Sequence, residues 1–184
     1  MPRLFAVCTP GLELFLAGEL DQLGLPTVHP SSQPEDISLL IEPADEVGGV
    51  EFRGALPDLY RANLHLRTAS RILLQLGAFF ADTFSDLRRR ARRLPWENHL
   101  HPRRAVSLRV TCHKSRLFHS GAVTERIMGA MADRLGQPPP VQKFKSDGDT
   151  HLPQLVIVRL VENRCTIHID SSGPLLYRRG YRTR

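Results

Sequence analysis

The sequence predicts an α+β protein made of two units. Apolar residues follow helical and strand periods in turn along the whole chain. Residues 1–83 carry 5 basic and 11 acidic side chains, a formal charge of −6, whereas residues 84–184 carry 20 and 8, a charge of +12. Such asymmetry is typical of two units with different roles. We therefore expect one domain at 1–82 and another at 83–184.

The first domain begins with an apolar strand at residues 4–8. Thr9 and Pro10 suit the start of a helix. Leucines at helical spacing, with Phe15 beside them, predict the buried face of that helix, which ends at Gly24: Leu12, Leu16, Leu20 and Leu23. Two strands, a helix and a strand follow, at 37–41, 50–52, 56–66 and 70–80. The order β-α-β-β-α-β predicts a ferredoxin-like split βαβ unit.

The second domain alternates helices and strands. Apolar residues at helical spacing predict a helix that starts at Phe84 and extends to Leu94. An alternating strand at 106–113 precedes a helix at 121–135, which Gly136 and three prolines end. The runs 155–161 and 164–170 predict a hairpin, turned at Glu162-Asn163. The first of these runs is nearly all apolar, so we expect it at the centre of the mixed sheet of an α/β unit.

Composition excludes a membrane protein and favours a reducing compartment. No apolar run approaches the roughly 18 residues that a membrane span needs. The three cysteines, Cys8, Cys112 and Cys165, are scattered, which indicates free thiols in core positions and a cytoplasmic location.

Little in the sequence indicates catalysis. No glycine-rich cofactor loop joins a strand to a helix. No Cys/His cluster has the spacing of a metal site, and His99 and His101 fall in a loop. Asp170, Ser171 and His168 supply the residue types of a nucleophilic site, but a small enzyme would need them to converge in a pocket. We expect no catalytic residue, metal or cofactor on this chain.

The stretch TCHKSRLFHSG (111–121) indicates a binding site for an anion. It connects a predicted strand to a helix whose first N–H groups favour negative charge. Lys114 and Arg116 supply positive charge, and Phe118 and His119 can stack on or flank a base. Catalysis and metal binding are the alternatives for this stretch, and both lack further partners.

Three other segments are basic. Arginines crowd the helix at 88–93, and Lys143 and Lys145 flank Phe144. The tail interleaves tyrosines with arginines, which is typical of proteins that bind unpaired RNA. The competing interpretations are a solvated helix face and a tail that only packs against the sheet.

Two pairs of stretches resemble one family. TCHKSRLFHSGAVTERI (111–127) and TIHIDSSGPLLYRRGYR (166–182) resemble the THUMP domain of bacterial RNA guanine-N2 methyltransferases. VCTPGLELFLAGEL (7–20) and GGVEFRGALPDLYRANLHLRTASRILL (48–74) resemble the ferredoxin-like domain that precedes THUMP in those proteins. The stretch 30–46 departs from the family as an insertion.

The resemblance implies an RNA-binding module. In the family, the two domains guide ribosomal or transfer RNA to a C-terminal methyltransferase domain that binds S-adenosylmethionine, and the chain lacks that domain's motif. Family positions and local charge together give the predicted RNA-binding residues: His113, Lys114, Ser115, Arg116, His119, Lys143, Lys145, Arg178, Arg179, Arg88, Arg89 and Arg92. A stand-alone RNA-binding adaptor and a protein-interaction module with an acidic partner remain as alternatives.

Overall fold

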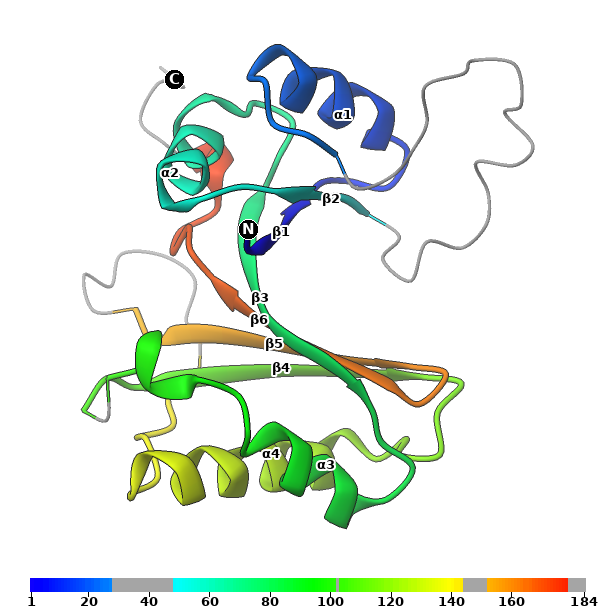
Figure 1. Ribbon diagram of the computed structural model, residues 1–184, viewed down its shortest axis with the longest axis vertical. Helices are drawn as coiled ribbons and strands as arrows, with labels where there is room; N and C mark the ends of the chain where they lie inside the picture. Colours follow the sequence, from blue (N-terminus) through cyan, green and yellow to red (C-terminus); the bar gives the residue numbers. More distant parts are fainter. Residues whose placement is uncertain (28–47, 102, 144–151, 179–184) are drawn as a thin grey trace. The chain divides into compact units, whose positions relative to one another are not determined.

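The computed structural model describes residues 1–27, 48–101, 103–143 and 152–178 (Figure 1). The predicted strand 37–41, the 30–46 segment, Lys145 and Arg179 lie outside these ranges. The chain folds into two compact units. One comprises Met1–Leu74 and the residues from Pro174 onward, and the other comprises Gln75–Gly173. The tail belongs to the first unit because Leu176 is buried in its core and donates its N–H to the Ser70 carbonyl at 2.9 Å.

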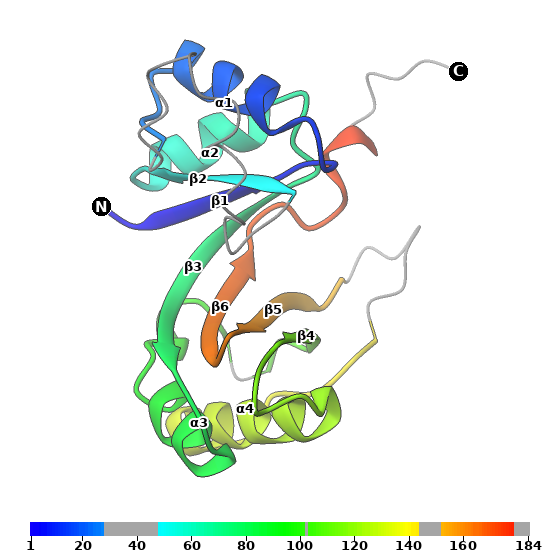
Figure 2. The same cartoon turned by 90° about the vertical axis from the view of Figure 1, so that its right-hand side faces the viewer.

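The first unit has an antiparallel sheet with the order β2-β1-β3. Its strands are β1 (Arg3–Val7), β2 (Gly49–Arg53) and the beginning of β3 (Arg71–Phe80). Helices α1 (Glu13–Gln22) and α2 (Leu56–His65) cover one face of this sheet (Figures 1 and 2). Both helices bury their apolar residues against the strands in one core. The ferredoxin-like prediction is confirmed.

The start of α1 differs from the prediction. The helix begins at Glu13, and Thr9 contributes only its backbone carbonyl, which accepts the Leu12 N–H at 3.1 Å. The Glu13 carboxylate accepts the N–H groups of Gly11 at 2.7 Å and of Gly48 at 3.1 Å. A carboxylate in the first helical turn is favoured by the macrodipole and also joins the chain on either side of α1.

The buried face of α1 was predicted only in part. Leu16 and Leu20 are fully buried, whereas Phe15 is 69% exposed and Leu12 is 38% exposed. The segment is apolar on most sides, so its period does not decide which residues face the strands.

The second unit has a mixed sheet with the order β3-β6-β5-β4. Strand β4 (Val106–His113) pairs parallel with β5 (Gln154–Val161), which pairs antiparallel with β6 (Arg164–Asp170). Helices α3 (Phe84–Ala91) and α4 (Ser120–Leu135) lie together on one face of these strands (Figures 1 and 2). The predicted hairpin and the central position of β5 are confirmed.

Local signals fix the ends of these elements. Thr83 caps α3 by accepting the Asp86 N–H at 3.1 Å. Gly136, at φ 80°, ends α4 in the left-handed conformation. Glu162 and Asn163, at φ 49° and 67°, form the two-residue turn between β5 and β6, and this turn matches the twist of a hairpin.

The helix η1 (Trp96–Asn98) follows α3 and is anchored by its tryptophan. Trp96 is fully buried, and its indole N–H donates to the Ala91 carbonyl at 2.8 Å. The side chain therefore ties the end of α3 to the core that α4 and the sheet share.

Candidate nucleic-acid interface

The loop after β4 is held by the turn between β5 and β6. Ser115 Oγ donates to the His113 carbonyl at 2.9 Å and accepts the Asn163 N–H at 3.0 Å. Asn163 Oδ1 in turn accepts the Arg116 N–H at 2.7 Å. Lys114 adopts φ 46°, a left-handed conformation that the bonds on either side impose. The predicted site residue Ser115 is thus a structural clamp, and Asn163, which was not predicted, is its partner.

The clamp leaves two cationic side chains at the surface. Arg116 is 73% exposed, and its Nη1 lies 3.9 Å from Asp82 Oδ1, so part of its charge is balanced. Lys114 is exposed, and no ion pair of its side chain is found within the described ranges. An exposed pair at this distance is weak, so an incoming phosphate can compete with Asp82 for the guanidinium group.

The other predicted loop residues have different roles. His119 Nδ1 accepts the Ala122 N–H at 3.2 Å and so caps α4. Leu117 is buried and anchors the loop, whereas the neighbouring Phe118 is 79% exposed. An exposed aromatic ring that follows the cationic Lys114 and Arg116 suits base stacking.

Two of the predicted α3 arginines pair with acidic side chains. Arg88 donates from Nε and Nη2 to the two carboxylate oxygens of Asp133, both at 2.8 Å. This pairing raises the pKa of Arg88 and lowers the pKa of Asp133. Arg89 pairs with Asp86 one turn earlier. Arg88 therefore joins α3 to α4.

The arginine surface of α3 is consequently divided. Arg92 is exposed, and its charge helps to lower the pKa of Asp133. Arg90 and Arg93 are exposed, and their side chains make no ion pair or hydrogen bond in the part of the chain that the structure describes. The exposed positive charge of this segment is therefore carried by arginines other than Arg88, because Arg88 is paired with Asp133.

The remaining predicted cations lie elsewhere. Lys143 is exposed in the second unit. Arg178 belongs to the first unit, and its guanidinium carbon stands 5.8 Å from the ring centre of Tyr177. This geometry is that of a cation–π pair, so the tail carries an ordered arginine beside an aromatic ring.

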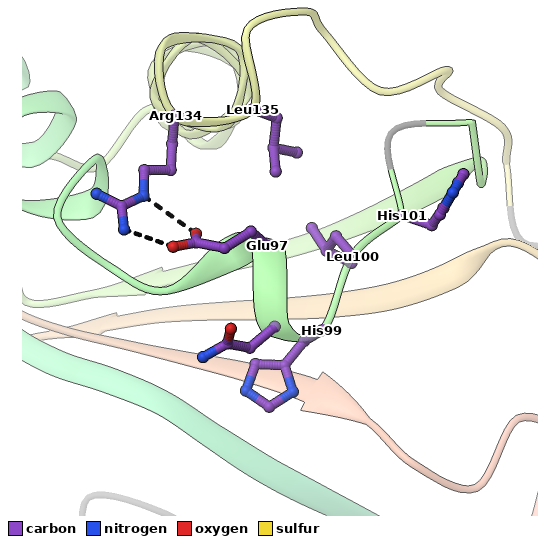
Figure 3. Close-up of a pocket in the computed structure, with 7 residues that line it drawn as sticks. Glu97, His99, Leu100, His101, Arg134 and Leu135 are labelled. Atoms are coloured by element: carbon purple, nitrogen blue, oxygen red, sulfur yellow. Dashed lines mark hydrogen bonds and ion pairs between the residues drawn. The ribbon is translucent and has the colours of Figure 1, made fainter.

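A pocket between η1 and α4 holds a further ion pair, between Arg134 and Glu97 (Figure 3). Arg134 donates to both carboxylate oxygens of Glu97, at 3.0 and 2.5 Å. The hydrogen bonds from Arg134 lower the pKa of Glu97 to about 2, which makes this carboxylate a poor general base. The imidazoles of His99 and His101 lie apart from the pair. The pocket is best explained as the joint between η1 and α4.

Metal-ligating side chains and thiols were the other candidates for chemistry. They include no group of three or more metal-ligating side chains. All three thiols are free, and burial raises the pKa of Cys8 to about 11 and of Cys165 to about 12, so both stay protonated at neutral pH. No described helix is both long and apolar enough to cross a bilayer.

Asp170, Ser171 and His168, which the sequence analysis considered as an enzyme alternative, do not form an open site. His168 and Asp170 are 3% and 5% exposed. Asp170 Oδ1 accepts the Ser172 N–H at 3.1 Å, which closes the turn after β6. Burial, and secondarily the charge of Arg159, lower the pKa of His168 to about 4.

Comparison with known proteins places this geometry in a family. Residues 35–73 match the RlmL ferredoxin-like domain, and residues 81–170 match the THUMP domain. The chain is 32% identical to the ribosomal RNA large subunit methyltransferase K/L of Cellvibrio japonicus and 31% identical to that of Methylococcus capsulatus. These alignments cover 98% and 97% of the chain but 22% of each relative.

A solved structure has the same fold. The structure of a predicted N6-adenine-specific DNA methylase from Listeria monocytogenes superposes with a TM-score of 0.76 at 27% identity. The match covers 98% of this chain and 43% of that one, so the chain spans less than half of the proteins it resembles. The chain belongs to the family in which an RlmL ferredoxin-like domain is followed by a THUMP domain.

Proposed function

We propose that this chain is an RNA-binding module that positions structured RNA, ribosomal or transfer, for a guanine-N2 methyltransferase domain C-terminal to it. The observation that carries the proposal is the clamped loop after β4. Bonds from Ser115 and Asn163 hold its backbone, so Lys114 and Arg116 are presented from a fixed frame. A preorganised cationic loop loses less entropy on binding than a flexible one.

The methyl donor would bind outside this chain. S-adenosylmethionine sites in open α/β folds use backbone groups where a strand meets a helix. In the first unit the corresponding N–H groups of Gly11 and Gly48 are already bonded to Glu13. These two N–H groups are therefore not available to a cofactor, and we assign the described residues no catalytic step.

The proposed contacts follow from exposure and charge. Lys114 and Arg116 would bind phosphate oxygens, and Phe118 would stack on a base, because stacking tolerates any base. The exposed Arg92 and Lys143 would add phosphate contacts in the second unit, and the tail's Arg178 would offer a separate contact in the first unit. The free cysteines are consistent with a cytoplasmic location, which we also propose.

The test is RNA binding by fluorescence anisotropy across a series of salt concentrations. The labelled probes are transfer RNA and a ribosomal stem-loop, and the variant is Lys114→Gln/Arg116→Gln. A matched control, Arg53→Gln/Arg67→Gln, removes the same charge from exposed positions of the first unit. Each lost phosphate contact to a single strand lowers the log–log salt slope by about 0.7, so we expect a loss of about 1.4 for the loop variant.

The outcomes separate the alternatives. A smaller slope for the loop variant, with an unchanged slope for the control, would support the proposal. If the unmodified chain ignores both RNAs at low salt, the proposed function is wrong. If it binds and neither variant differs from it, the loop is not the contact.

A further inference from the structure

The strand register of the second unit sorts its residues onto two faces. Leu108 of β4 lies opposite Val156 of β5, which lies opposite Ile169 of β6. These residues pack into the core beneath α3 and α4. Side chains alternate along a strand, so the intervening residues occupy the face away from both helices.

That second face contains three arginines. Arg109 lies in register with Ile157, and Ile157 with His168. Arg159 lies in register with Thr111 of β4 and with Thr166 of β6. Two residues further along β5, Val161 lies in register with both His113 and Arg164. We call five of these residues the basic sheet face: Arg109, Thr111, His113, Arg159 and Arg164. Sequence analysis placed only His113 among the binding residues.

Acidic residues are scarce on this face. Among the residues of β4, β5 and β6 that occupy it, the one carboxylate is Asp170, which is buried and bonded within its own turn. Burial falls along the face, from Asp170 and His168 to Arg109, Thr111 and His113, which are exposed. The positive charge therefore lies toward the exposed end.

Arg109 differs from the arginines that the sequence analysis placed in the binding site on α3 and in the loop. On α3, Asp133 and Asp86 pair with Arg88 and Arg89. At the loop, Asp82 approaches Arg116. On β4, by contrast, Arg109 is exposed, and no ion pair or hydrogen bond of its side chain is found among the described residues.

We propose that the basic sheet face binds the phosphate backbone of the RNA and continues into the loop after β4. This rests on the proposed function, because it names the surface that the same RNA would follow. Five residue steps along β4 separate Arg109 from Lys114, about 17 Å in an extended strand. Guanidinium groups bind phosphates bidentately, and threonine hydroxyls add further donors.

The chemistry of the face points to backbone rather than base recognition. Its rows hold serine, arginine, threonine, histidine and aliphatic side chains but no phenylalanine, tyrosine or tryptophan, and its exposed ring is the imidazole of His113 at the end next to the loop. Base stacking on a sheet, as in RNA-recognition motifs, needs exposed aromatic residues. Contact along Arg109, Thr111 and Arg159 is therefore to phosphate and sugar, and it follows the shape of the RNA rather than its sequence.

The experiment compares two arginine pairs on opposite sides of the sheet in the 184-residue chain. Arg109→Gln/Arg159→Gln alters the basic sheet face. Arg90→Gln/Arg93→Gln removes the same charge from the last turn of α3 and the residues just after it, where both arginines are exposed. Binding of a fluorescein-labelled RNA stem-loop with a single-stranded tail is measured by anisotropy from 50 to 300 mM KCl. Arg109→Gln alone, at an exposed position, covers the case in which the double variant misfolds.

We expect the sheet variant to raise Kd about tenfold or more and to lower the salt slope by about 1.4, with the α3 variant close to the unmodified chain. If the unmodified chain binds and the sheet variant binds equally well, the inference is overturned while the proposed function stands. Equal weakening in both variants also overturns it, in favour of diffuse attraction. No binding by the unmodified chain refutes the proposed function and this inference together.

Discussion

Acidification should destabilise the second unit through one buried histidine. His168 is 3% exposed on β6, and its pKa is lowered to about 4, first by burial and then by the charge of Arg159. The unfolded chain should have the ordinary histidine pKa of about 6.5. Between these two values the unfolded state binds a proton that the folded state does not bind. The free energy of unfolding therefore falls as pH falls from about 6.5 toward 4.

The size of the effect follows from the same values. A difference of about 2.5 pKa units corresponds to about 3 kcal/mol if the whole window is crossed. Linkage gives a loss of about 2 kcal/mol between pH 7 and pH 5. The paired carboxylates of Glu97 and Asp133 have lowered pKa values, so their contribution is lost only at lower pH, as pH falls below about 4.5. Burial also lowers the pKa of His99, which adds a contribution of the same sign.

The assay is urea unfolding at pH 7, 6 and 5, followed by tryptophan fluorescence. Trp96 is the chain's one tryptophan and is buried in the unit that contains His168, so its emission reports that unit. The unmodified chain is compared with His168→Gln and with His65→Gln, which changes an exposed histidine of the first unit. The quantity compared is the change of stability with pH, so a general destabilisation by the variant does not matter.

We expect the pH dependence to shrink by about 2 kcal/mol in His168→Gln and to persist in His65→Gln. If the unmodified chain and His168→Gln lose the same stability between pH 7 and pH 5, His168 is not held neutral by burial, and the reasoning fails.

Two further predictions concern packing. Trp96→Phe should lower the free energy of unfolding by about 2 kcal/mol, because it leaves a void and removes the hydrogen bond from the indole to the Ala91 carbonyl. The Ala91 carbonyl still accepts the Leu94 N–H. The measurement is urea unfolding followed by circular dichroism, and an unchanged midpoint would contradict the burial of Trp96. Gly49→Ala should lower the free energy of unfolding by about 1–3 kcal/mol, because the new methyl group would collide with Ala6 and Phe5. Gly18→Ala in α1 places its methyl group in open space and should raise the free energy of unfolding by about 0.5–1 kcal/mol. Thermal melts that rank the two variants the other way would refute this account.

The arginines show why the clustering of charge along the chain is a poor guide to which cations share a surface. The sequence groups five of them at 88–93, which predicts one continuous surface. In the folded chain, Arg88 is bonded to Asp133 from a helix 45 residues away in sequence. Conversely, Arg109 and Arg159 are separated by 50 positions, yet their strands are adjacent and in register.

The sequence by itself determined the order of elements, most of their ends and the division of charge. These properties depend on local terms: the period of apolar residues, the left-handed backbone at Gly136, and the two-residue turn at Glu162 and Asn163. Local terms failed at α1, where apolar residues surround the helix and only packing against the strands selects Leu16 and Leu20.

Only the tertiary structure decided which of the proposed binding side chains share a surface. The alternation of β4 indicates that Arg109 and His113 share one face, but it does not say what lies beside them. The parallel register of β4 with β5 places Arg159 opposite Thr111, and a shift of one residue would bury it. Likewise, the bond from Asn163 to Arg116 joins residues 47 positions apart. Pairings of this kind depend on the packing of distant segments, which no local pattern encodes.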